Sequence, residues 1–199
     1  MNIKNSLKLL AFLLTIQITG QISHKDLENQ SKAAYYSYTN LDSLFKISRI
    51  LEKSSNSCIS YNGKTNVASA YYKLGKFKKS EEISLKVLLD LKGATTTCDL
   101  NNKSNALTRL FWIKNNERKF NEAIKYLNQR RELLESYSER DDKYLIKKIG
   151  IKTSLALVKN SLGFHKEAIE LAKQAIIEYS QIKYEFSFIH NYPLKVSRA

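Results

Sequence analysis

Two short helical patterns meet at a glycine in the stretch from Ala70 to Leu88, and this junction restricts the possible folds more than any other feature. Small and apolar residues recur at helical spacing on both sides of it: Val67, Ala70, Tyr71 and Leu74 before, and Phe77, Ser80, Ile83, Ser84, Val87 and Leu88 after. Gly75 can adopt the positive φ that ends a helix. The stretch therefore predicts a tight helical hairpin, and a single hairpin needs neighbours to bury its apolar face.

The pattern recurs along the chain. Phe120 follows Phe77 by 43 residues, and Gly163 follows Gly75 by 88, which is two steps of 44. A weaker copy precedes Gly75, so we expect four hairpins, at about 24–55, 61–92, 104–137 and 143–182. Only one proline and six glycines occur among the 199 residues, and strand-type alternation is scarce. The predicted fold class is all-α.

The spacing of Gly75, Phe77, Ser80 and Val87 resembles that of the tetratricopeptide repeat. Further matching positions are small or aromatic: Ala68, Tyr71, Ala123 and Ala168. The resemblance implies a right-handed α-solenoid of about four antiparallel hairpins over residues 21–183, with small residues where the two arms cross closely. The step of 43 to 45 exceeds the standard repeat of about 34 residues. The chain is therefore similar to the divergent, long-period type found in bacterial extracytoplasmic proteins and sensor regions.

The resemblance also implies a concave surface, formed by the first arm of each hairpin, that binds an extended peptide. The expected partner-binding residues are Thr65, Ser69, Tyr72, Lys73, Thr108, Trp112, Asn115, Asn116 and Asn160. Neighbouring positions on the same faces are Asn62, Asn105, Thr153, Leu157 and Ser161. Amides and hydroxyls suit a peptide backbone, and Tyr72 and Trp112 would supply apolar anchors. A packing role is an equal alternative for Trp112.

Residues 1–20 have the layout of a secretory signal peptide, with Lys4 and Lys8 ahead of an apolar run from Leu9 to Ile16. We expect cleavage near Gly20 and a periplasmic or extracellular mature protein without an integral membrane segment. An uncleaved anchor or an amphipathic first helix is the alternative. Residues 184–199 form a tail whose aromatic residues would cap the last hairpin, unless the chain is the front part of a longer sensor protein.

Cys58 and Cys98 each fall in the predicted connection after a second-arm helix. Equivalent loops of consecutive repeats are neighbours in a solenoid, so an exported protein would allow a disulfide between them. Two free thiols are the alternative.

The formal net charge of +14 comes from lysines scattered over every predicted helix. Such scatter favours a solvated surface over a nucleic-acid site. The three histidines lack metal-ligand spacing, and no phosphate-binding or nucleophile motif occurs. His165 occupies the position of Phe77, which predicts a packing role.

We therefore expect a non-enzyme without cofactor or metal that binds a protein or peptide partner. The alternatives are the sensory part of a signal-transduction protein and a basic helical-repeat nucleic-acid binder.

Overall fold

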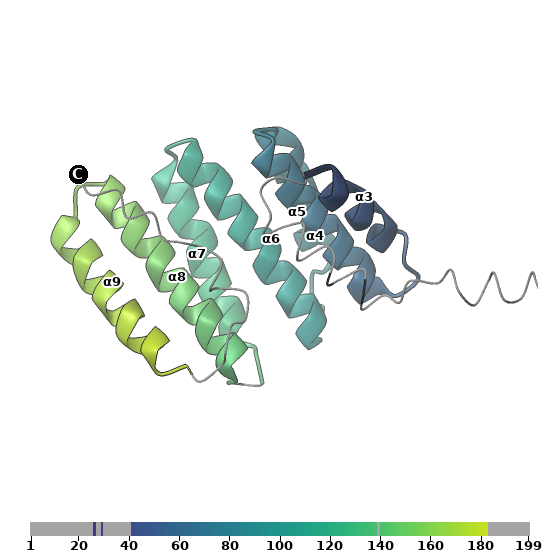
Figure 1. Ribbon diagram of the computed structural model, residues 1–199. Coiled ribbons are helices and arrows are strands. Elements are labelled where there is room, and N and C mark those ends of the chain that lie inside the picture. The colour runs from purple at the N-terminus through teal and green to yellow at the C-terminus, as the bar shows by residue number, and fades with distance from the viewer. Residues whose placement is uncertain (1–25, 27–28, 30–40, 139, 183–199) are drawn as a thin grey trace, which may run out of the picture. The chain divides into compact units, whose positions relative to one another are not determined.

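The computed structural model describes residues 26, 29, 41–138 and 140–182. Between residues 41 and 182 the described residues form seven helices and no strand (Figure 1). The helices are α3 (Leu41–Glu52), α4 (Ser57–Lys73), α5 (Phe77–Asp90), α6 (Thr97–Asn116), α7 (Phe120–Glu135), α8 (Asp142–Ser161) and α9 (His165–Ser180). The all-α expectation is confirmed for this part of the chain. The expected leader and the tail lie outside the described residues, as does the first arm of the first hairpin apart from residues 26 and 29.

The chain divides into two units, Met1–Asp90 and Leu91–Ala199. In the first unit, α4 packs against both α3 and α5. In the second unit, α6, α7, α8 and α9 pack in chain order, each against the next (Figure 1). Helices that are adjacent in sequence are therefore adjacent in space within each unit, as an array of helix pairs requires.

Three helix pairs are joined by the same type of turn. In the α4–α5 turn the amide of Lys76 donates to the carbonyl of Tyr71, and the amide of Gly75 donates to the carbonyl of Tyr72, both at 2.9 Å. These two bonds define the Schellman motif, which satisfies carbonyls that the helix end leaves unpaired. The equivalent bonds in the α6–α7 and α8–α9 turns run from Lys119 to Lys114, Arg118 to Asn115, Phe164 to Lys159 and Gly163 to Asn160.

The residue in the left-handed position is not glycine in every turn. Gly75 has a φ of 70° and Gly163 a φ of 86°, which confirms the role expected of Gly75. The α6–α7 turn instead places Arg118 there, with a φ of 57°. An L-residue in this conformation brings its Cβ too close to a carbonyl oxygen, at a cost of about 1–2 kcal/mol.

A small residue is buried where each second-arm helix crosses its partner. Ser80, Ala123 and Ala168 hold this position in α5, α7 and α9. The hydroxyl of Ser80 donates to the carbonyl of Ala68 in α4 at 2.7 Å. The expected close crossing is therefore confirmed for α4 and α5, because only a small side chain leaves a helix backbone within reach of a serine oxygen.

The helices α3 and α4 touch through a glycine that the sequence pattern did not single out. A Cβ atom added to Gly63 of α4 would lie 2.4 Å from the amide nitrogen of Glu52 and 2.7 Å from the carbonyl oxygen of Ser48. Both of those atoms belong to the backbone of α3, which cannot move aside as a side chain would. Gly63 is therefore required for the packing of α3 against α4.

Two apolar clusters form the core of the second unit. The first joins α6, α7 and α8 through Phe111, Ala123, Leu127 and Val158. The second gathers Leu100, Leu134, Tyr137, Tyr144 and Ile151 toward the other end of these helices. Among the described residues, no helix combines the length and the apolar character that crossing a bilayer requires.

Candidate functional site

The expected groove residues of α4 divide into two kinds. Thr65 and Ser69 are buried, with 4% and 8% of their surface exposed. The hydroxyl of Thr65 donates to the carbonyl of Asn62 at 2.9 Å, and that of Ser69 donates to the carbonyl of Thr65 at 3.0 Å. Tyr72 and Lys73, at the end of the helix, are half-buried. Of these four residues, the two that are accessible to a ligand therefore lie in the last turn of α4.

The expected groove residues of α6 are all half-buried or exposed. The hydroxyl of Thr108 donates to the carbonyl of Ser104 at 2.7 Å. Asn115 is half-buried and Asn116 is exposed, both in the last turn of the helix. In these threonines and serines the hydroxyl hydrogen already bonds the helix that carries it, which leaves only oxygen lone pairs for a partner.

Tyr72, Asn115 and Asn160 occupy equivalent positions in the three turns, and Tyr72 and Asn160 each contact the first residue of the following helix. In the first turn the rings of Tyr72 and Phe77 lie 5.4 Å apart between centroids. In the third turn Nδ1 of His165 lies 2.8 Å from Oδ1 of Asn160. The same two positions thus form an aromatic pair in one copy and a polar pair in another.

His165 is exposed at the start of α9. The expected packing role of this histidine is therefore wrong. Its ring lies at the surface, where Oδ1 of Asn160 can accept a hydrogen bond from it.

In the α6–α7 turn, Oδ1 of Asn115 is enclosed and has no hydrogen-bond partner. The first residue of α7 in this turn is Phe120, whose ring cannot replace the donor that His165 offers in the third turn. A buried carbonyl without a donor raises the free energy of the folded state.

Trp112 is half-buried and packs against the cluster formed by Phe111, Ala123, Leu127 and Val158. Its ring meets that of Phe111 edge to face, with centroids 5.0 Å apart. The indole therefore contributes to the core of the second unit, and only its exposed part is available to a ligand.

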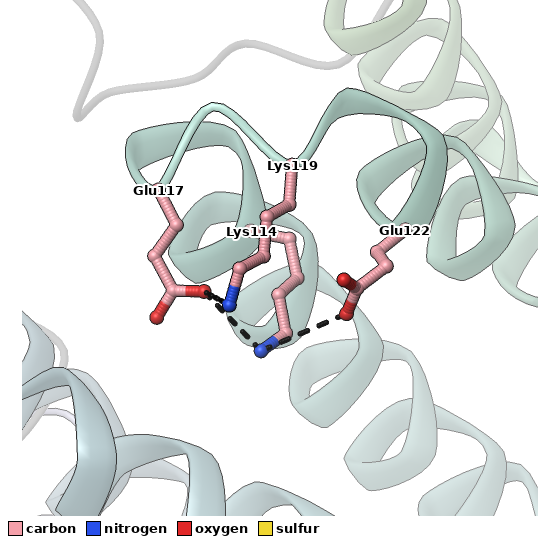
Figure 2. A network of polar contacts seen from close by, with 4 residues as sticks. All are labelled: Lys114, Glu117, Lys119 and Glu122. Carbon is pink, nitrogen blue, oxygen red and sulfur yellow. Dashed lines mark hydrogen bonds and ion pairs between the residues drawn. The ribbon is translucent and has the colours of Figure 1, made fainter.

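A network of ion pairs surrounds the α6–α7 turn (Figure 2). Lys114 is 6% exposed, and its Nζ lies 3.3 Å from Oε2 of Glu117 and 3.8 Å from Oε2 of Glu122. Lys119 reaches the same oxygen of Glu117 at 3.0 Å. Figure 2 shows both ammonium groups converging on Glu117, whose pKa is lowered chiefly by the hydrogen bond from Lys119. This network was not identified from the sequence. The available signal was the spacing of two lysines and two glutamates within nine residues, from Lys114 to Glu122.

An open hollow of about 300 Å³ adjoins this turn. It is lined by Arg118, Lys119, Phe120, Asn121, Glu122 and Leu162. The volume is at the lower end of the range for small-molecule sites. The lining mixes both charge signs with two apolar side chains, so it favours no single ligand chemistry.

The cysteines lie inside helices. Cys58 is the second residue of α4 and Cys98 the second residue of α6, so the expectation that they occupy connections is wrong. The physical reason is that Asn56 and Thr96 act as N-caps and start these helices just before the cysteines. Both sulfurs are in the disulfide-bonded state, and the described residues contain no free cysteine.

No group of three or more His, Cys, Asp or Glu side chains gathers closely enough to hold a metal ion within the part of the chain that the structure describes. Comparison with models of known families, with curated proteins and with solved structures finds no match to this chain.

Proposed function

We propose that this chain is a non-catalytic interaction scaffold: a right-handed solenoid of tetratricopeptide-like hairpins that binds a peptide or protein partner through its first-arm helices, α4 in the first unit and α6 and α8 in the second. The observation that carries the proposal is the threefold recurrence of one turn, with equivalent hydrogen bonds at steps of 43 and 45 residues. Arrays that repeat one backbone unit create extended surfaces, which is how such proteins bind partners.

The variable positions of this surface support the proposal. Tyr72, Asn115 and Asn160 are equivalent by position, yet they offer one aromatic ring and two amides. Lys73, Asn116 and Ser161 follow them at the ends of α4, α6 and α8. A constant backbone with different side chains at one register suits recognition of a particular sequence, because each repeat then reads a different part of the ligand.

The proposal includes export. Cleavage near Gly20 would place the mature chain in the periplasm or outside the cell, where a bond between Cys58 and Cys98 forms readily. Peptide mapping of the non-reduced protein tests this pairing. A peptide pair joined through the two cysteines supports it, and recovery of both as alkylated thiols contradicts it.

The function is tested by selecting peptides from a random displayed library on the full chain and measuring their affinity by calorimetry. Tyr72→Ala and Asn116→Ala should each weaken a selected peptide at least tenfold, an effect of about 1.4 kcal/mol. The matched controls are Tyr179→Ala on α9 and Asn128→Ala on α7, which replace exposed residues of the same types away from the proposed face. Equal affinity of all four variants would refute the groove, and a preference for oligonucleotides over every selected peptide would favour the nucleic-acid alternative.

A further inference from the structure

Arg130 interrupts the repeat pattern at a position that is otherwise small and apolar. Val87 of α5 and Ala175 of α9 occupy the equivalent position, 43 residues before Arg130 and 45 after it, and they are 0% and 2% exposed. The third copy places a half-buried guanidinium in α7 instead. A cation at a core position needs a partner, because transfer from water disfavours its charged form.

The partner that Arg130 finds is neutral. Its Nε donates to the hydroxyl of Ser104 on α6 at 3.0 Å, and none of the carboxylates in the described residues forms an ion pair with it. Arginine presents five donors, and most of them remain for a ligand.

A second cation lies near this guanidinium, and it too has a neutral acceptor. Nζ of Lys147 in α8 donates to Oδ1 of Asn101 at 2.7 Å, and the hydroxyl of Tyr137 donates to the same oxygen at 3.0 Å. Lys147 also lies 4.9 Å from the centroid of the Tyr137 ring. The cluster thus holds two positive charges, and its hydrogen-bond acceptors are an amide and a hydroxyl.

The terminal nitrogens of Arg130 face a gap in the side chains of α8. A Cβ atom added to Gly150 would lie 3.9 Å from both NH1 and NH2, which is an ordinary contact distance. Unlike Gly63, this glycine is not required by a neighbouring backbone. Glycine inside a helix is disfavoured relative to alanine, and at Gly150 it leaves space in front of the guanidinium fork.

The electrostatics of the cluster agree with this geometry. Burial lowers the pKa of Arg130 to about 10. Burial also lowers the pKa of Lys147; the carboxylate of Asp141 opposes this shift, and the positive charges of Arg130 and Lys143 add to it. Burial raises the pKa of Tyr137 to about 12, so its hydroxyl is a neutral donor at physiological pH. Both cations therefore stand to gain from a nearby negative charge.

We infer that Arg130 and Lys147 form a binding site for an oxyanion, a carboxylate or phosphate group, whose oxygens occupy the space beside Gly150 and accept hydrogen bonds from the terminal nitrogens of Arg130. Planar guanidinium forks match such groups with two parallel bonds. The site is built from α6, α7 and α8 of the second unit, and it does not depend on the peptide groove.

The test measures the thermal unfolding midpoint of the full chain in increasing inorganic phosphate or acetate, at constant ionic strength maintained with sodium chloride. A saturable rise of about 5 °C is expected with at least one of the two anions. The anion that acts at the lower concentration identifies the group, phosphate or carboxylate, for which the site is built.

Three variants separate a site from a general salt effect. Arg130→Gln should abolish the saturable rise, and Gly150→Ala should shift it to at least tenfold higher anion concentration by filling the space beside the fork. Arg131→Gln, which removes an exposed arginine next in the chain, should respond like the wild type. If Arg130→Gln does not fold, Gly150→Ala decides. A rise that is absent from the wild type, or unchanged in Gly150→Ala, would overturn the inference.

Discussion

The α4–α5 turn and the α6–α7 turn have the same backbone hydrogen bonds but different side chains at five of the seven positions from Tyr71 to Phe77. Gly75 in the first corresponds to Arg118 in the second, and Tyr71 corresponds to Lys114. The turn geometry is therefore determined by satisfaction of the last carbonyls of the helix, and glycine lowers its energy without being indispensable.

The two turns also use different chemistry to hold the second arm. Tyr71 packs edge to face on Phe45 with ring centroids 5.0 Å apart, and Nζ of Lys79 lies 5.6 Å from the Tyr71 centroid. At the corresponding positions of the other turn, Lys114 pairs with Glu122. In the α4–α5 turn the lysine is on the second arm and contacts an aromatic ring on the first arm. In the α6–α7 turn the lysine is on the first arm and forms an ion pair with a carboxylate on the second arm.

The largest effect is expected from Gly75→Ala. No atom lies within 4 Å of the added Cβ, so the cost is purely conformational and should lower the free energy of unfolding by about 1–2 kcal/mol. Urea denaturation followed by circular dichroism measures it. Arg118→Ala is the matched control, because Arg118 already has a Cβ in this conformation. A loss of equal size in both variants would contradict the comparison.

A smaller effect of opposite sign is expected from Arg118→Gly. Glycine removes the strain at φ 57° but gains entropy in the unfolded chain, so the net stabilisation should be about 0.5–1 kcal/mol. The side chain of Arg118 is exposed, and none of the ion pairs of the turn includes it. The fluorescence of Trp112, on the adjoining helix, reports the transition. A destabilised variant would show that the arginine makes a contribution beyond the turn.

The helices and the glycine turns were predictable because they follow local rules. Helical spacing and a positive φ are properties of a few successive residues, which a sequence displays directly. The Arg118 turn had no glycine to mark its left-handed residue, and its position followed only from the repeat length. Gly63 was missed because the reason for it lies in the backbone of another helix.

The candidate site was less predictable for the same physical reason. The register of the repeat located Thr65, Ser69 and Thr108, but it did not reveal that their hydroxyls bond their own helices. The role of Arg130 was not visible in the sequence, since its hydrogen-bond partner Ser104 lies on a different helix from the arginine. Side-chain partners depend on tertiary packing, which a single periodic pattern does not encode.

The smallest expected effect is on the pH dependence of stability. It concerns Glu117, which occupies in the α6–α7 turn the position that Leu74 holds in the α4–α5 turn. Hydrogen bonding from Lys119 lowers the pKa of Glu117, so the ionised carboxylate stabilises the fold above the ordinary value of 4.5. This stability, under about 1 kcal/mol for a partly exposed pair, is lost as the pH falls through 4.5 and then through the lower pKa of the folded state.

Urea titrations followed by Trp112 fluorescence should show that Glu117→Gln loses less stability over this range than the wild type. Glu132→Gln, an exposed carboxylate of α7, should keep the wild-type slope. Parallel pH curves for Glu117→Gln and the wild type would show that the network in the α6–α7 turn adds nothing to the backbone motif that it shares with the α4–α5 turn.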